Sequence, residues 1–328
     1  MGGSSHTLRW PRVDASSDAF PDIDGASPQI DALKQHMRRV ADDAYVTVLI
    51  LGESGTGKER VARAIHDRSP RRNAPFVVVN CAGLSPSLIE DELFGHVRGA
   101  FTGAMADQPG PFERANGGTV FLDEVGELTP ELQLKLLRAI QQRTVQRLGG
   151  TRETPFDVRV IAATNADLSR AVAQGRFRQD LYFRLKVYEL RVPPLRHRGA
   201  PHVRLLAATI LKQLGARRKR PPAALDAHVW DRFVDYAWPG NVRELENTLE
   251  RMVVAAGASG WLTVDHLPEG FGVRAERETG APAVLPDRDA VIAALERHGF
   301  ARGRAAAALG VSRHQLYRLI RRYQISSE

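Results

Sequence analysis

Short apolar runs alternate with amphipathic segments along the N-terminal part of the chain. Five runs, four of them rich in β-branched residues, cover residues 46–51, 76–79, 119–122, 159–164 and 188–192. Segments with helical spacing lie before and between them, among them 27–40 and 59–66. Strands that alternate with helices form a parallel sheet that is covered on both faces. The pattern therefore predicts an α/β core with a five-stranded parallel sheet.

The pattern changes after residue 198, and this change sets the expected domains. Residues 199–268 read as a small helical lid, in which Asn241 is expected to cap a helix. Residues 269–286 are rich in Gly, Ala, Pro and charge and read as a linker. Residues 1–21 are polar and read as a short lead-in, so we expect no separate sensory domain before the core at 22–198.

Three helices are expected in the tail at 289–298, 303–309 and 313–323, and the turn at 310–312 joins the last two. Residues 287–328 hold eight arginines and four acidic residues, a net charge of +4 within the +8 of the whole chain. A basic helix-turn-helix suggests a DNA partner, although a three-helix oligomerisation module would show a similar pattern. The residues expected to contact DNA are Ser312, Arg313, His314, Tyr317, Arg318, Arg321 and Arg322.

Composition limits the cellular compartments in which the protein is expected to work. The chain has one cysteine, Cys81, which cannot form an internal disulfide, and no apolar run is long enough to span a membrane. We therefore expect a cytoplasmic protein with no membrane partner.

A glycine-rich segment directly follows the first expected strand and precedes a helix. It consists of Gly52, Glu53, Ser54, Gly55, Thr56, Gly57, Lys58 and Glu59. The spacing Gly-x4-Gly-Lys in this context is typical of a loop whose backbone N–H groups surround phosphates, with Lys58 reaching the terminal phosphates. The alternative is a glycine-rich turn without a ligand.

Polar side chains follow the next strands at the edge where such sheets bind ligands. Asp123 suits Mg²⁺ and Glu124 suits the activation of a water molecule that attacks a γ-phosphate. Asn80 follows the second strand, and Asn165 could hold the attacking water. The acids could instead be strand-end caps, and Asn165 a turn residue.

An amphipathic segment at 175–185 carries Arg176, Arg178 and Arg184. Most arginines on such a face are solvated, but in an oligomeric ATPase they can reach a neighbour's nucleotide. The basic run at 217–220 reads more readily as a solvated loop than as a binding site.

Three glycines at 95, 99 and 103 disfavour a core element for the segment around Phe101. We expect a protruding loop that holds an aromatic side chain with little to pack against.

These residues resemble the sigma-54-dependent transcriptional activators of the AAA+ superfamily, over residues 20–328. The most specific match is the hexapeptide Gly99, Ala100, Phe101, Thr102, Gly103 and Ala104, which resembles the family's loop that contacts sigma-54. Residues 52–59 resemble the Walker A segment, and Asp123 and Glu124 resemble the Walker B pair. Unfoldases and replication initiators of the same superfamily lack the hexapeptide, and a plain DNA-binding regulator with a dead nucleotide site would lack Lys58 or the acids.

The resemblance implies further roles. Asn80 resembles the asparagine that restrains the catalytic glutamate, Thr164 and Asn165 resemble sensor I, and Arg243 resembles sensor II. Arg178 and Arg184 resemble arginines that act on a neighbouring subunit in a ring hexamer. The implied cofactors are ATP and Mg²⁺, and the implied partners are the sigma-54 RNA polymerase holoenzyme and enhancer-like DNA.

The chain departs from the family pattern at Gln179, where Glu is usual, at Lys186, where Asn is usual, and at Pro201 and His202, where acidic residues are frequent. We expect no control by phosphorylation of a receiver domain. Control by a separate inhibitory or co-activating protein, or at the level of expression, is expected instead.

Overall fold

The structure is a computed structural model that describes residues 23, 27–83, 85–221, 223–257, 259–269, 271 and 286–298, and in the tail residues 305, 306, 308, 309, 311, 316, 319, 320 and 323. The chain forms two compact units, residues 1–267 and 268–328. Each unit is described by itself.

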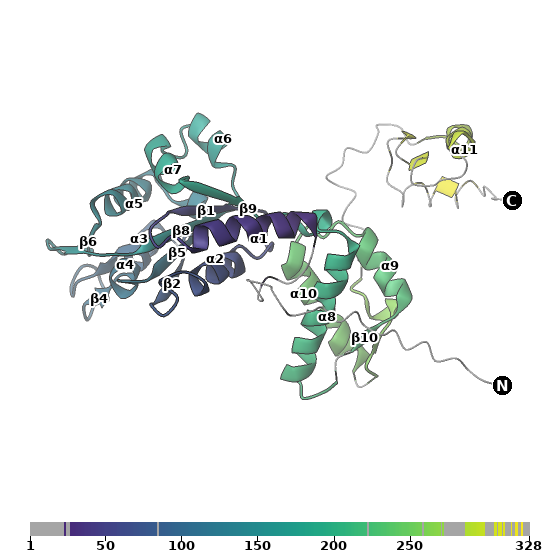
Figure 1. The fold of residues 1–328 in the computed structure, drawn as a ribbon, viewed down its shortest axis with the longest axis horizontal. Helices are drawn as coiled ribbons and strands as arrows, with labels where there is room; N and C mark the ends of the chain where they lie inside the picture. Colours follow the sequence, from purple (N-terminus) through teal and green to yellow (C-terminus); the bar gives the residue numbers. More distant parts are fainter. Residues whose placement is uncertain are drawn as a thin grey trace. The chain divides into compact units, whose positions relative to one another are not determined.

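The first unit is built on a five-stranded parallel sheet with the strand order β2-β5-β8-β1-β9 (Figure 1). The strands are β1 Val48–Leu51, β2 Phe76–Asn80, β5 Thr119–Asp123, β8 Arg159–Thr164 and β9 Tyr188–Arg191. The α/β prediction is confirmed, and the expected strands match these within two residues at each end.

Helices cover both faces of the sheet. They are α1 Pro28–Ala41, α2 Lys58–Asp67, α3 Pro86–Phe94, α4 Pro111–Arg114, α5 Pro130–Gln142, α6 Leu168–Ala173 and α7 Gln179–Leu185, with short 3-10 turns η1 Val125–Glu127 and η2 Leu195–His197. Side chains alternate between the faces because successive strand residues point in opposite directions. In β5, Leu122 packs on the face covered by α3, α5 and α7, while Phe121 packs on the face covered by α1 and α2.

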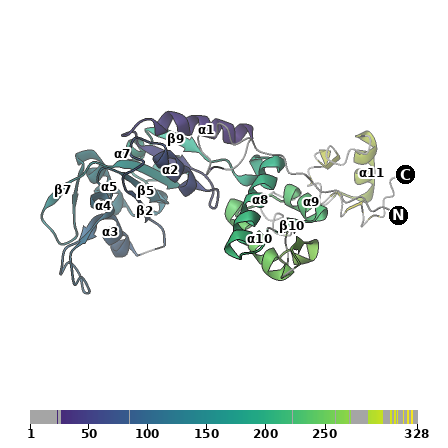
Figure 2. The same ribbon diagram turned by 60° about the horizontal axis from the view of Figure 1, so that its bottom comes forward.

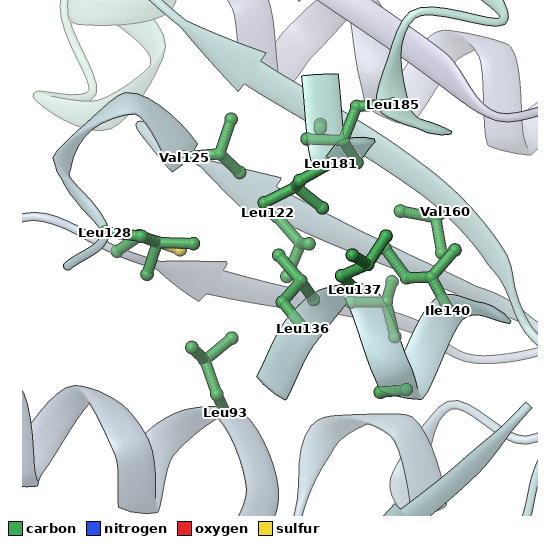
Figure 3. Close-up of a cluster of buried hydrophobic side chains, with 14 of the residues drawn as sticks. Leu93, Leu122, Val125, Leu128, Leu136, Leu137, Ile140, Val160, Leu181 and Leu185 are labelled. Atoms are coloured by element: carbon green, nitrogen blue, oxygen red, sulfur yellow. The ribbon is translucent and has the colours of Figure 1, made fainter. Parts of the chain in front are cut away.

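The larger apolar cluster joins the sheet to α3, α5 and α7. Figure 3 shows its side chains pointing toward one another, among them Leu93, Leu122, Leu136, Ile140, Val160 and Leu181. Leu136 and Leu181 are completely buried, so truncating either to alanine would cost about 2–5 kcal/mol of folding free energy. This packing holds the edge of the sheet at which the polar residues emerge.

Two small hairpins that the sequence pattern did not predict extend from the core. One pairs β3 Gly95–His96 with β4 Gln108–Pro109, and the other pairs β6 Thr144–Gln146 with β7 Glu153–Pro155. Figure 2 shows β7 at the outer edge of the core. The backbone of Leu148 accepts a hydrogen bond from Val97 at 3.0 Å and donates one to Gly95 at 2.9 Å. The hairpins therefore support each other.

The lid consists of α8 Ala200–Arg217, α9 Ala227–Asp235 and α10 Asn241–Ala256 (Figure 1). It also holds a short parallel pair, β10 Ala224–Leu225 and β11 Trp261–Leu262, followed by η3 Val264–His266. Trp238 is completely buried and donates its indole N–H to the carbonyl of Phe233 at 2.8 Å. The expected helical lid is confirmed, and the short pair of β10 and β11 is an addition that the sequence pattern did not predict.

The second unit contains α11 Arg288–Arg297, close to the first helix expected in the tail, and its N-cap Asp287 accepts from the backbone of Ala290. Val291 and Leu295 pack with Leu316 and Leu319 in a common apolar cluster. All seven residues expected to contact DNA lie outside the described residues. No described helix has the length and apolar character that crossing a membrane requires.

Candidate nucleotide site

The glycine-rich loop connects β1 to α2 as predicted. Gly57 has a φ of 95° and caps α2, a conformation that favours glycine. Lys58 is 6% exposed, and its ammonium group donates to the carbonyl of Gly52 at 3.1 Å and to Glu124 at 3.0 Å. Gly55 lies under the lid, since a Cβ atom there would meet the carbonyl oxygen of Gly240 at 2.3 Å.

A cavity of about 740 Å³ opens over this loop between the core and the lid. Its polar end is formed by residues 54–60 with Asp123, Glu124 and Arg243. Its apolar wall includes Ile30, Leu33, Val192, Leu206 and Val242. A cavity with phosphate-binding groups at one end and an apolar wall beside them is shaped for a nucleotide.

The two acids reach the cavity from the end of β5. Burial, and next the charge of Glu124, raise the pKa of Asp123. The charge of Lys58 acts in the opposite direction but does not outweigh these two causes. A divalent cation beside Asp123 would favour the ionised carboxylate, and Asp123 would be the protein ligand of that cation. Within the described residues no three potential ligands form a cluster, so water and phosphate oxygens would complete the shell, as Mg²⁺ usually requires.

The neighbouring strand ends arrange the polar groups around Glu124. One carboxylate oxygen of Glu124 accepts from the backbone N–H of Asn165 at 2.9 Å. Asn80 lies opposite Asp123 in the sheet register, and its side-chain oxygen accepts from the backbone of Ala82 at 3.0 Å. The hydroxyl oxygen of Thr164 accepts from the backbone of Ala166. The restraining contact from Asn80 to Glu124 that the resemblance implies is not among the contacts of the described residues and stays a prediction.

The lid contacts the phosphate loop through the start of α10. Arg243 donates to the hydroxyl of Ser54 at 3.0 Å, which places it at the cavity as expected. The side chain of Asn241 donates to Glu53 at 3.1 Å and to the carbonyl of Ser54 at 3.0 Å, and accepts from the backbone of Leu195 at 2.8 Å. The predicted helix cap at Asn241 was wrong, because Gly240 is the cap and Asn241 has a φ of 53°.

Two arginines after β9 also bind the loop, and no sequence motif pointed to a role for them. Arg196 forms a two-pronged ion pair with Glu53, which holds the pKa of that carboxyl below its usual value. Arg198 is buried and donates to the carbonyl of Thr56 at 2.7 Å. Only their place after the last strand of the sheet could have pointed to them, because the loop they contact lies more than 130 positions earlier.

Arg178 and Arg184 do not line the cavity formed by the described residues of their own chain. Arg178 pairs with Asp180 at 2.7 Å, and both side chains are exposed. Arg184 donates weakly to the carbonyl of Ile140 at 3.4 Å and lines a separate hollow with Arg143 and Val187. The action of both arginines on a neighbouring subunit stays a prediction.

The segment at 99–104 forms the tip of the β3–β4 hairpin. Phe101 is 42% exposed, and its ring meets the ring of His96 edge-on at 5.0 Å. His96 in turn contacts Asp91 at 2.6 Å. The backbone of Gly99 donates to Ala104 at 2.9 Å, which closes the tip. The loop is exposed as predicted.

Comparison with protein families identifies the parts of the chain. Residues 23–191 match the sigma-54 interaction domain, 198–283 the AAA+ ATPase lid domain, and 287–323 the Fis family of bacterial regulatory proteins. The chain belongs to the sigma-54-dependent transcriptional activators. The family assigned from the hexapeptide and the nucleotide loop is therefore confirmed.

Among its relatives is the Nif-specific regulatory protein of Azotobacter vinelandii, 44% identical over 304 residues, which cover 90% of this chain and 58% of the relative. The regulatory protein ZraR of Klebsiella oxytoca is 46% identical over 299 residues, which cover 89% of this chain and 67% of ZraR. The chain thus spans about three fifths to two thirds of the length of these relatives.

A solved structure of NtrX from Brucella abortus in complex with ATP is similar, with a TM-score of 0.71 and 32% identity over 92% of this chain and 69% of NtrX. A structure of the same protein in complex with ADP gives the same score and identity. The AAA+ type of domain indicates an ATPase in general terms.

Proposed function

We propose that this protein binds ATP and Mg²⁺ in the cavity under the lid and uses hydrolysis to remodel a sigma-54 RNA polymerase closed complex into an open one. The site of action is the cytoplasm, and the tail binds enhancer-like DNA. The observation that carries this proposal is the exposed Phe101 on a hairpin that is covalently continuous with the nucleotide site through α3.

The chemistry at the site rests on three kinds of groups. Lys58 and the backbone N–H groups of the loop bind the phosphates, and Glu124 orients and deprotonates the attacking water. Mg²⁺, when bound beside Asp123, would neutralise charge on the phosphate oxygens. Arg243 responds to the nucleotide from the lid side.

The remaining groups come from a neighbouring copy. Arg178 and Arg184 lie away from the cavity of their own chain, and we propose that they complete the site of the next subunit in a ring, by family analogy a hexamer. A separate inhibitory or co-activating protein, or control of expression, would restrain such a ring.

A structural change caused by hydrolysis can be transmitted from the nucleotide site to the hairpin through a short stretch of chain. Asn80 and Asp123 are sheet neighbours, and the backbone of Cys81 donates to the carbonyl of Asp123 at 2.9 Å. From this point the chain runs through α3 directly into β3 and the tip that bears Phe101. A shift at the end of β2 would therefore move the tip, and the apolar ring would bury itself in sigma-54.

Phe101→Ala and Thr102→Ala test the proposal, with Met105→Ala as the matched control. Met105 is 83% exposed on the same hairpin but lies outside the hexapeptide. We expect the two test variants to hydrolyse ATP within about twofold of the unaltered protein and to lose sigma-54 binding and open-complex formation. Normal promoter opening by the test variants, or equal loss in the control, would overturn the proposal.

A further inference from the structure

Arg198 is a buried cation at the junction of the core and the lid. Its side chain is 6% exposed and lines the nucleotide cavity. Nε donates to the carbonyl of Pro193 at 2.9 Å, Nη2 donates to the carbonyl of Thr56 at 2.7 Å, and Nη1 lies 3.5 Å from Nε2 of His202.

No carboxylate of the described residues forms an ion pair with Arg198. Burial alone lowers its pKa, to about 10, so the group stays charged at neutral pH. His202 supplies no negative charge. It is 1% exposed, its Nδ1 has no hydrogen-bond partner, and burial, together with the nearby charge of Arg198, lowers its pKa to about 4. The positive charge of Arg198 is therefore balanced only by carbonyl dipoles.

The other cations that line the cavity are either paired with a carboxylate or exposed. Arg63 and Arg243 are exposed, and Arg243 donates to the hydroxyl of Ser54. Lys58 pairs with Glu124 at 3.0 Å, and Arg60 pairs with Glu246 at 2.9 Å. Arg196, two positions before Arg198, pairs with Glu53. A charge that is buried without a counter-ion costs stability, and an anion that enters the cavity would offset that cost.

The hydrogen bond from Arg198 to the carbonyl of Thr56 also affects the N–H group on the other side of the same peptide. The carbonyl of Thr56 and the N–H of Gly57 belong to one peptide unit, and Gly57 caps α2 at the phosphate end of the cavity. A cation that holds the oxygen of a peptide draws electron density toward it and makes the N–H on the other side a stronger donor. Arg198 thus lies behind a peptide whose donor serves the phosphates.

We propose that Arg198 is a positioning residue that strengthens phosphate binding by polarising the peptide between Thr56 and Gly57 and by the positive charge that it places behind the phosphate loop. The inference rests on the proposed binding of ATP. It requires that the contribution of Arg198 to affinity grows with the number of phosphates on the ligand, whereas a purely structural role would affect all adenine ligands alike.

The test measures the affinity of the full chain for adenosine, AMP, ADP and ATP. Arg198→Met keeps much of the length of the side chain and removes its charge, Arg198→Lys keeps the charge, and Arg170→Met on the exposed face of α6 is the control. We expect Arg198→Met to bind adenosine as the unaltered protein does and to lose affinity stepwise, by ~10-fold for ATP. Arg198→Lys should restore most of this loss.

Thermal unfolding without nucleotide is the second measurement. Arg198→Met removes a buried charge but also the donors to the carbonyls of Pro193 and Thr56, so its own unfolding temperature without nucleotide serves as the baseline. The shift of the unfolding temperature produced by ATP should be smaller in Arg198→Met than in the unaltered protein. Equal losses for adenosine and ATP, or an undiminished ATP shift, would overturn the inference. If the unaltered chain itself does not bind ATP, the proposed function fails instead.

Discussion

The ammonium group of Lys58 lies 3.0 Å from a carboxylate oxygen of Glu124, and the two side chains are only 6% and 17% exposed. Lys58, which would bind the terminal phosphate, thus forms an ion pair with Glu124, which would activate water. On the proposed function, a bound triphosphate would draw Lys58 toward itself, weaken this ion pair and free Glu124 to act as a base, so the contact would couple nucleotide binding to activation of the base.

Glu124→Gln keeps the shape of the side chain and removes its basicity. We expect ATP binding to persist and hydrolysis to fall at least ~100-fold, because a general base contributes about 10²–10⁴. Nucleotide titration and steady-state phosphate release measure the two effects separately. Glu127→Gln, a change of the same kind three residues later, is the control. If Glu124→Gln hydrolyses ATP at nearly the rate of the unaltered protein, Glu124 is not the general base.

Mixing two inactive variants tests the role of Arg184 between subunits. Arg184→Ala and Lys58→Ala should each lose more than ~100-fold in hydrolysis. In an equimolar random ring about a quarter of the interfaces combine an intact Lys58 with an intact neighbouring Arg184, so activity should recover to roughly that fraction. Phosphate release from the mixture is the measurement, and the unmixed variants at the same total concentration are the control. Without recovery, Arg184 does not act across an interface.

Asn241→Ala should uncouple the lid from the phosphate loop. Asn241 is completely buried, and its loss leaves the backbone N–H of Leu195 without an acceptor while alanine must hold a φ of 53°. We expect a loss of about 2–4 kcal/mol in unfolding free energy and weaker ATP binding. Denaturant unfolding measures the loss of unfolding free energy. Asn247→Ala, at an exposed position on the same helix, should change neither the unfolding free energy nor ATP binding. A change of less than about 0.5 kcal/mol would show that this junction is not structurally important.

The pH dependence of the unfolding free energy should reveal the protonation of His202. The pKa of this buried group falls from 6.5 to about 4 because burial and the charges of Arg198 and Lys34 disfavour its protonated form. The folded state therefore resists a proton that the unfolded chain takes up. Stability from this group is complete above pH 6.5 and is lost as pH falls toward 4, by on the order of 3 kcal/mol in total.

His202→Gln removes that titration and should flatten the stability profile between pH 6.5 and 4. His66, whose pKa is also lowered by burial, will retain part of the slope, so the comparison is the difference between the variant and the unaltered protein. His228→Gln, on the exposed face of α9, should leave the profile as it was. Parallel profiles for His202→Gln and the unaltered protein would contradict the assignment.

Local patterns were sufficient to predict much of this protein. Runs rich in β-branched residues predicted four of the five strands of the sheet, because a strand buried on both faces is mostly apolar, and the mixed run at 188–192 predicted the edge strand β9. The loop at 52–59 and the acids at 123 and 124 were predicted as parts of one site because the carboxyl ends of parallel strands meet at one edge. The hexapeptide around Phe101 pointed to the family and to an exposed tip, since its glycines fit no buried element.

Contacts between distant segments were decided only by the tertiary structure. Arg196, Arg198 and Asn241 reach the phosphate loop across more than 130 positions, and no local spacing encodes which carbonyl or carboxylate an arginine will meet. The same holds for Lys58 and Glu124, whose ion pair depends on β1 and β5 being placed two strands apart. Sequence alone determined which chemical groups are present and roughly where the strands of the main sheet lie. Packing of the sheet and the lid decided which of those groups face one another, because charge compensation in a buried site depends on the whole fold.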